Sequence, residues 1–343
     1  MKPGTFLLSL LLFSLPLLSL LVFYFWQDPF KVIHHYDSYI DSGKPYYIGL
    51  NRDYVSTENW VNHYPEYKYD SYIFGNSRSL FYRIESWKNF IGEPASKCYH
   101  FDASGETLYG LEKKLRFLAG QNAGIRHSLI LLDFYTLQHI TNSEGHLFIK
   151  DPRTSGQSRL AFQAAFLKSF FSFNFFRTFF DLKLSGRIKQ YMEDSIIDGR
   201  TFAYDKISNE MTMPLLENLI ETDPVRYYEA HRALFYPRKP EQQVYDTVIG
   251  PAQIKLLESI HYILKADSSD YRIVVNPLYD QLKLNPADLR QLKNIFGNGN
   301  VFDLSGINWF TEDIHHYYET SHYRPYVADS IMALVYSEGN RLR

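Results

Sequence analysis

The chain begins with a strongly apolar segment. Residues 6–26 (FLLSLLLFSLPLLSLLVFYFW) carry no charge, and a helix of that length just spans the hydrocarbon core of a bilayer, which is about 30 Å thick. Lys2 precedes the run, and Tyr24 and Trp26 lie at its far end, where interfacial aromatic residues are common. A cleavable signal peptide would have a shorter apolar region followed by small residues. We therefore predict a cytoplasmic tail at residues 1–5 and an uncleaved, single-pass transmembrane signal anchor at 6–26, with the rest of the chain outside the cytoplasm.

Residues 27–65 form a polar and aromatic stretch without a clear period, which we predict as a stalk and lead-in to the domain. A second pattern begins after this stretch. Short apolar runs then alternate with segments whose apolar residues have helical spacing. This alternation predicts a mostly parallel sheet covered by helices on both faces, that is, a flavodoxin-like, three-layer α/β domain over residues 66–343. Predicted strands are residues 71–74, 97–101, 128–134, 271–276 and 301–304, and predicted helices are 107–118, 286–296 and 327–335.

Residues from about 150 to 250 interrupt the alternation. A polar, glycine-bearing loop leads into the Phe-rich stretch LAFQAAFLKSFFSFNFFRTFFDLKL, and more polar helical segments follow. We predict a helical insertion between two strands. Its aromatic stripe either packs on the sheet domain, as such stripes usually do, or forms a lid or a surface that rests on the membrane.

Composition narrows the function classes. The net charge is -2, with 36 basic and 38 acidic residues in scattered positions, so no basic stripe indicates a nucleic-acid partner. Cys98 is the one cysteine, which excludes an intrachain disulfide, and its position in a predicted strand indicates a buried thiol. The sequence has no P-loop and no Gly-x-Gly-x-x-Gly motif, and His315, His316 and His322 lack the spacing of known zinc sites. We expect no metal and no cofactor.

Ser77 is the first candidate for chemistry. It follows a predicted strand and Gly75, at a turn into a predicted helix. Such a turn exposes the hydroxyl at the sheet edge, and the backbone N–H at the same position can stabilise an oxyanion. The alternative is an ordinary helix N-cap, and the Gly-x-Ser-x-Gly motif of α/β-hydrolases is not met.

A serine nucleophile needs a base, and the base needs an acid to orient it. Two acid-x-x-His pairs lie near the C-terminus: Glu319 with His322, and Asp313 with His316. We favour Glu319 and His322, because a proline and the final amphipathic helix follow directly. The alternative for each histidine is a solvated loop residue.

These motifs together resemble the SGNH/GDSL hydrolase superfamily. They are YIFGNSRS at residues 72–79, a glycine (Gly105) after the second strand, LLDFYT at 131–136, and HYRP at 322–325 before the last helix. The order is similar to that of the membrane-anchored branch in bacterial cell-envelope pathways, which includes alginate O-acetylation factors and the D-alanyl-transfer protein of teichoic acid synthesis. The resemblance covers about residues 70–335, apart from the insertion.

The resemblance implies roles for individual residues. Ser77 would be the nucleophile, His322 the general base, and Glu319 the acid that orients His322. The backbone N–H groups of Ser77 and Gly105 would form the oxyanion hole.

Three further residues would line the site: Asn76, Arg78 and Asp133. Asp133 stands where the family usually has an asparagine that donates to the oxyanion, and a carboxylate there would oppose the charge. Asp133 is alternatively structural, holding a loop or Arg78.

The implied function is that of an esterase or O-acyltransferase acting on a cell-envelope or exopolysaccharide glycan or its acyl carrier, with a membrane acyltransferase as a possible partner. The alternative is a catalytically inactive assembly or binding subunit of an envelope polysaccharide complex. Two departures from the family pattern favour the alternative: Glu319 replaces the usual aspartate, and Asp133 replaces the asparagine.

Overall fold

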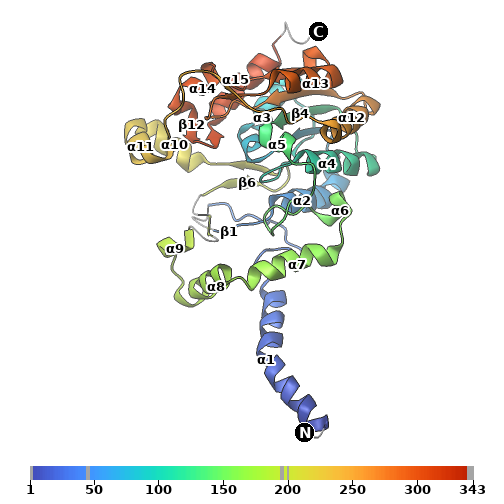
Figure 1. Cartoon of the computed structure of the whole chain (residues 1–343), viewed down its shortest axis with the longest axis vertical. Coiled ribbons are helices and arrows are strands. Elements are labelled where there is room, and N and C mark those ends of the chain that lie inside the picture. Colours follow the sequence, from blue (N-terminus) through green and yellow to red (C-terminus); the bar gives the residue numbers. More distant parts are fainter. Residues whose placement is uncertain (1–2, 44–46, 194–196, 199–200, 338–343) are drawn as a thin grey trace.

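One long helix precedes the folded domain (Figure 1). The computed structural model describes residues 3–43, 47–193, 197–198 and 201–337; Met1 and Lys2 of the predicted tail lie outside them. Helix α1 (Pro3–Gln27) is the one described helix long and apolar enough to span a membrane, with a mean hydropathy of 2.6 over its best window. The expected apolar helix is therefore present. It is not buried against the rest of the chain in that window.

A five-stranded, all-parallel sheet is the centre of the domain. Its order is β11-β9-β4-β2-β3, and every neighbouring pair is parallel. The chain runs outward from β2 to β3 and then returns past β2 to β4, so its direction reverses between β2 and β4. In open sheets of this kind, ligands bind outside the carboxyl ends of the strands at that reversal. The strands are β2 (Ser71–Phe74), β3 (Cys98–His100), β4 (His127–Leu132), β9 (Asp270–Val275) and β11 (Val301–Asp303).

Side chains alternate between the two faces of the sheet, and each face has its own apolar core. Ile73 and Leu131 point to the core that includes α3 (Ile84–Ile91) and α15 (Pro325–Val335). Phe74 and Leu132 point to the opposite core. The helices of the opposite core are α2 (Arg52–Tyr67), α4 (Leu108–Gly120), α12 (Pro251–Ala266) and α13 (Pro286–Phe296). A mixed α/β domain with helices on both faces of a parallel sheet is thus confirmed.

Helix α2 corrects the prediction of a stalk at residues 27–65. It lies within that stretch, and its buried residues are mostly polar: Arg52, Asp53, Ser56, Thr57 and Asn59, beside Val55 and Trp60. Its contacts with the apolar core come from its second half, at Trp60, Tyr64 and Tyr67. The polar first half shortens the apolar stripe, which is why the sequence pattern did not reveal the helix. The segment is part of the folded domain.

The insertion lies between β4 and β9, as predicted, and it has two parts. Its Phe-rich helices α7 (Arg159–Phe170) and α8 (Phe173–Ser185) lie beside the end of α1, whereas α10 (Pro214–Thr222) and α11 (Pro224–Ala230) lie near the C-terminal elements (Figure 1). The antiparallel pair β6 (Ala203–Asp205) and β7 (Glu210–Thr212) comes between them in the chain.

Short elements complete the chain. Three two-stranded pairs are β1 (Tyr47–Ile48) with β5 (Ile197–Asp198), β8 (Gln243–Val244) with β10 (Leu282–Lys283), and β12 (Tyr317–Glu319) with β13 (His322–Tyr323). The short helices are η1 (Ser77–Phe81), α5 (Phe134–Gln138), α6 (Pro152–Ser155), α9 (Gln190–Glu193), η2 (Arg232–Leu234), η3 (Asn298–Asn300), α14 (Trp309–Glu312) and η4 (Ile314–His316).

Candidate active site

The turn after β2 positions Ser77. A Cβ added at Gly75 would lie 3.0 Å from both Leu131 Cβ and Ser79 Cβ, so the chain passes too close to its neighbours for a larger residue. Asn76 caps the following 3₁₀-helix η1, because its side chain accepts a hydrogen bond from the Arg78 N–H at 3.1 Å. Ser77 is therefore the first residue of η1 and not its cap. The N-cap role that was the alternative for Ser77 is filled by Asn76.

Ser77, His322 and Glu319 form a continuous hydrogen-bonded chain. Ser77 Oγ lies 2.8 Å from His322 Nε2, and His322 Nδ1 bonds to the Glu319 carboxylate. The acid and the histidine are directly opposite each other in the hairpin β12–β13, and opposite residues in such a pair have Cβ atoms about 5 Å apart. This explains why an acid-x-x-His spacing brings the two side chains together. The arrangement has the geometry of a nucleophile, a base and an orienting acid.

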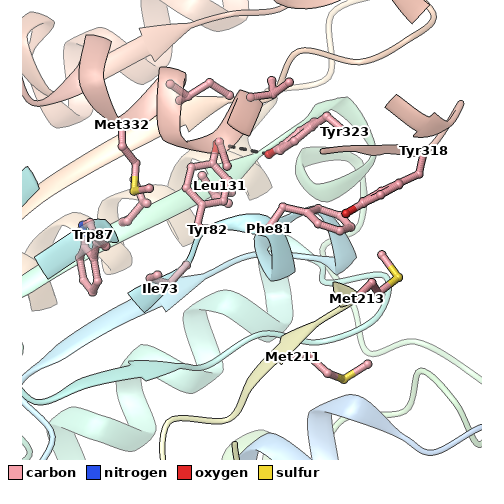
Figure 2. Packing of buried hydrophobic residues seen from close by; sticks show 14 of the residues in the cluster. Ile73, Phe81, Tyr82, Trp87, Leu131, Met211, Met213, Tyr318, Tyr323 and Met332 are labelled. Atoms are coloured by element: carbon pink, nitrogen blue, oxygen red, sulfur yellow. Dashed lines mark hydrogen bonds between the residues drawn. The ribbon is translucent and has the colours of Figure 1, made fainter. Parts of the chain in front are cut away.

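The hairpin packs against η1 through aromatic rings. Phe81, the last residue of η1, packs on the hairpin, with its ring centroid 5.6 Å from that of His322 and 5.4 Å from that of Tyr318. Figure 2 shows Phe81 and Tyr82 beside Tyr323, and the Tyr323 hydroxyl donates to the Tyr82 hydroxyl at 3.2 Å. These contacts hold the strand that carries His322 next to the helix that begins at Ser77.

The insertion also holds the hairpin. Tyr227 and Tyr228 of α11 donate hydrogen bonds to the carbonyl oxygens of Tyr318 (3.0 Å) and Tyr317 (2.8 Å), respectively. Arg324, just after the hairpin, forms a two-pronged ion pair with Glu217 of α10 at 3.1 and 2.7 Å. These contacts could not be predicted from the sequence, because tyrosine hydroxyls that bond to backbone carbonyls leave no spacing pattern.

Asp133 is placed as a structural residue. It is buried, and its carboxylate accepts hydrogen bonds from Asn76 (2.7 Å), from Arg78 (2.8 Å) and from both the N–H and the hydroxyl of Thr136 (2.8 and 3.0 Å). These donors neutralise the carboxylate. Asp133 therefore fixes the turn around Ser77 through its two neighbours, whereas Asn76 and Arg78 themselves line a cavity.

Gly105 follows β3 and faces Ser77. Its φ is +57°, a left-handed value that favours glycine, and an added Cβ would lie 3.1 Å from the Phe148 ring. Within the described residues, the backbone N–H groups of Ser77 and Gly105 donate to no protein acceptor. Both residues line the same two cavities. These two N–H groups are consequently available to a ligand oxygen.

Two cavities meet at Ser77, Gly105 and Phe148. One, of about 540 Å³, is lined mostly by residues with polar side chains, among them Asn76 and Arg78. The other, of about 320 Å³, is lined by His322 and by more apolar residues. These apolar residues are Leu50, Leu80, Leu147, Phe202 and Met211. Ser77 thus borders two cavities that differ in the residues that line them.

A buried ion cluster supports the loop that carries Gly105. It consists of Asp53, Glu106, Lys114 and Lys150, whose side chains are at most 2% exposed. Lys114 lies 2.7 Å from Glu106 and 3.2 Å from Asp53, and Lys150 lies 2.6 Å from Glu106. Glu106 also accepts from the Thr107 N–H at 2.9 Å, at the start of α4. The cluster therefore fixes the backbone next to Gly105.

Charges of opposite sign hold this cluster ionised. Burial alone would raise the pKa of Asp53, but the ammonium groups of Lys114 and Lys150 outweigh it, so the pKa is lowered. Burial alone would lower the pKa of Lys114, but the carboxylates of Asp53 and Glu106 outweigh it, so the pKa is raised. Sequence reasoning missed the cluster, because charged residues are ordinarily assigned to the surface.

The alternative pair, Asp313 and His316, is not assembled as a second site. The Asp313 carboxylate bonds to the His315 ring at 2.6 Å, and His316 contacts Asp313 through a backbone hydrogen bond from its N–H to the Asp313 carbonyl oxygen at 3.2 Å. His316 is 6% exposed, and its Nδ1 bonds to the carbonyl oxygen of Phe310 at 3.0 Å. The prediction that this pair could serve Ser77 is wrong for this structure, since Ser77 bonds to His322.

Comparison with known proteins leaves the site to be interpreted from its own geometry. No family model matches the chain, and no curated protein matches it either. In the described part of the chain, no group of three or more His, Cys, Asp or Glu residues is arranged to hold a metal ion.

Proposed function

We propose that this chain is a membrane-anchored, serine-dependent acyl-transfer enzyme of the SGNH type, either an esterase or an O-acyltransferase. The contact that carries the proposal is the 2.8 Å distance between Ser77 Oγ and His322 Nε2, because a serine becomes a nucleophile when a base takes its proton. The strand order supports the proposal, since it corresponds to the flavodoxin-like order 2-1-3-4-5. So does the position of Ser77 at the reversal of the sheet.

The reaction has two steps. His322 Nε2 takes the hydroxyl proton of Ser77 as Oγ bonds to the acyl carbon, and the N–H groups of Ser77 and Gly105 donate to the resulting oxyanion. The intermediate collapses when the ester bond breaks and His322 gives the proton to the leaving alcohol. A water or sugar hydroxyl then repeats the sequence on the acyl-serine, and its proton returns to Oγ through His322. Glu319 holds the imidazole and stabilises its charged form.

The substrate class follows from the two cavities and the anchor. Two cavities border Ser77, one lined mostly by polar residues and one by more apolar residues, and this pair fits an ester whose two parts differ in polarity, such as an acyl group on a carbohydrate. We place the domain on the extracytoplasmic side, acting on a cell-envelope or exopolysaccharide glycan or its acyl carrier, with a membrane acyltransferase as donor partner.

Labelling with a fluorophosphonate probe tests the activated serine. The purified chain should be labelled, and both Ser77→Ala and His322→Ala should abolish labelling. Ser104→Ala is the matched control, because Ser104 lines the same apolar cavity and should leave labelling intact. Labelling that persists in Ser77→Ala would contradict the proposal, and labelling lost in Ser77→Ala but kept in His322→Ala would exclude His322 as the base.

A second candidate is a non-catalytic assembly or binding subunit. The observation that favours it is the exposure of Glu319, whose side chain is 33% exposed, because water competes for an exposed acid and weakens its hold on the histidine. An unlabelled wild-type chain with normal thermal stability would select this candidate.

The side of the membrane has its own test. Cys98 is buried and 5% exposed, and burial raises the pKa of its thiol to about 12, so a maleimide should react only with an introduced cysteine. Tyr262 on α12 is 74% exposed. In intact cells, Tyr262→Cys should react with a membrane-impermeant maleimide; reaction only after lysis would place the domain in the cytoplasm.

A further inference from the structure

The Phe-rich helices of the insertion pack on the end of the membrane helix. Phe23 of α1 stacks on Phe180 of α8 with ring centroids 5.2 Å apart, and it meets Phe179 edge-on at 6.2 Å. Tyr24 of α1 lies 5.0 Å from Phe170 of α7. These rings belong to one buried aromatic cluster, separate from the two cores of the sheet domain. The last turns of α1 and the pair α7–α8 therefore form one packed unit.

This packing determines the depth of α8 relative to a bilayer. Phe23 is four residues from Gln27, the last residue of α1, which corresponds to about 6 Å along the helix. A helix that contacts Phe23 from the side lies at the same depth as Phe23. Helices that rest in the interface are buried about 5–10 Å into the headgroup and acyl boundary. A membrane that holds α1 must therefore also touch α8.

The outer surface of α7–α8 has the chemistry that this position requires. Large apolar side chains point away from the protein: Leu160 is 83% exposed, Phe173 is 75% exposed and Leu184 is 86% exposed. Residues 159–189 also contain six basic residues and one acidic residue, in a chain whose net charge is -2. The basic residues are Arg159, Lys168, Arg177, Lys183, Arg187 and Lys189.

We propose that α7 and α8 form a membrane foot: a helical pair that lies in the bilayer interface beside α1, with its apolar side chains among the lipid tails and its basic side chains at anionic headgroups. Anionic lipid attracts basic residues that lie near the membrane surface. Because the foot adds a second attachment beside α1, the domain is held at one orientation to the membrane and does not swing on a single helix. Figure 1 shows α7 and α8 at the level where α1 enters the domain, with the C-terminal elements at the far end. This inference needs α1 in a membrane but does not depend on the proposed acyl transfer.

The test uses the full chain in lipid nanodiscs of phosphatidylcholine with phosphatidylglycerol. Phe173→Cys and Leu184→Cys are each labelled with a nitroxide, and buried Cys98 leaves the background unlabelled. Collisions of the nitroxide with oxygen, which concentrates in lipid, are compared with collisions with a water-soluble nickel complex. Tyr262→Cys on α12 is the matched control, with 74% exposure on another helix.

We expect the labels at positions 173 and 184 to collide more with oxygen and several-fold less with nickel than the label at position 262. Nickel collisions equal to those at position 262 would overturn the membrane foot. Protection from both reagents would also overturn it, and would indicate a protein partner or a second copy over this surface. In nanodiscs without phosphatidylglycerol, both labels should lie closer to water. An unchanged depth would show that anionic headgroups do not contribute to the membrane foot. Because both positions are largely exposed, the variants should fold, and unchanged thermal stability verifies this.

Discussion

Two groups of ionisable side chains flank the loop after β3, and they differ in exposure. Glu319 and His322 are 33% and 16% exposed and face a cavity with Ser77. In the buried ion cluster, by contrast, no side chain is more than 2% exposed. A reacting group must be reached by substrate, whereas a positioning group is most effective when water is excluded. The comparison predicts that changes in the first group remove activity without unfolding the protein, and that changes in the second unfold it.

The largest expected effect is that of Ser77→Ala on turnover. Removal of the nucleophile from a serine relay costs about 10⁶ in kcat in other enzymes, and we expect a loss of that order with a small chromogenic ester. The free energy of unfolding should change by less than about 1 kcal/mol, because one partly exposed hydrogen bond is lost. Steady-state kinetics and urea unfolding measure the two quantities. A large loss of stability in Ser77→Ala would contradict the prediction that changes in this group remove activity without unfolding the protein.

Lys114→Met should have the opposite effect, with a large loss of stability and a small loss of turnover. It removes the cation nearest to Asp53 and one of the two cations that pair with Glu106, and breaking a buried ion pair in this way costs about 3–5 kcal/mol. Urea unfolding should show this loss, while the fraction that remains folded keeps most of its turnover. Lys113→Met is the matched control. Lys113 is the preceding residue and is 28% exposed, and its buried partner Glu112 keeps a second ion pair with Arg116, so we expect a change of less than about 1 kcal/mol. Equal losses in both variants would exclude a special role for the cluster.

The pH dependence of stability sharpens this result. The folded-state pKa of Asp53 lies below 3.8, so its contribution is present above pH 3.8 and is lost as the pH falls through the folded-state value. The folded-state pKa of Lys114 lies above 10.5, so its contribution is present below pH 10.5 and is lost as the pH rises through the folded-state value. The wild type should therefore keep both contributions to the free energy of unfolding between these limits and lose them outside, and the loss at high pH should be smaller in Lys114→Met. An equal loss at high pH in both proteins would point to other groups.

The same contrast in exposure explains how much the sequence could predict. The five strands of the sheet were located within two residues, because buried parallel strands are continuous apolar runs. Ser77 and the pair Glu319 and His322 could be named because they follow strands or precede a helix at recognisable spacing. Which of the two acid-x-x-His pairs faces Ser77 depends on a hairpin and on ring packing against Phe81, and the sequence left this choice open.

The other features of the fold could not be predicted, because the residues that determine them are polar. Helix α2 buries Asp53 and Asn59, and its first half supplies ion pairs and hydrogen bonds, so that the apolar stripe is short. Lys150 lies in the insertion but bonds to Glu106, a long-range pairing that no local pattern encodes. Polar side chains are paired by tertiary structure, whereas apolar periodicity is local, and only the second can be recognised in a single sequence.

A smaller effect is expected for Glu319→Gln. The amide keeps the shape but removes the charge that stabilises the protonated His322, and acid–base steps contribute about 10²–10⁴-fold. Because Glu319 is 33% exposed, we expect a loss in kcat at the lower end, about 10²-fold, with no loss of stability comparable to that of Lys114→Met. Glu319→Asp should restore part of the rate, since it keeps the charge but shortens the side chain. Turnover unchanged in Glu319→Gln would mean that the acid is not used.

The smallest effect concerns the link between the insertion and the hairpin. The Tyr228 hydroxyl donates to the carbonyl oxygen of Tyr317 at 2.8 Å, and its removal in Tyr228→Phe should cost about 1 kcal/mol of stability. Tyr227 still bonds to Tyr318 in this variant, so the hairpin should remain in place and kcat should fall by less than about tenfold, since a 1.4 kcal/mol change in barrier is tenfold in rate. KM should be unchanged, because Tyr228 is not among the lining residues of either cavity at Ser77. Tyr262→Phe, on an exposed ring, is the control. A fall in kcat without any loss of stability would show that α11 acts on the position of His322 more than on the fold. Tyr228 would then belong with the residues that determine activity rather than with those that stabilise the fold.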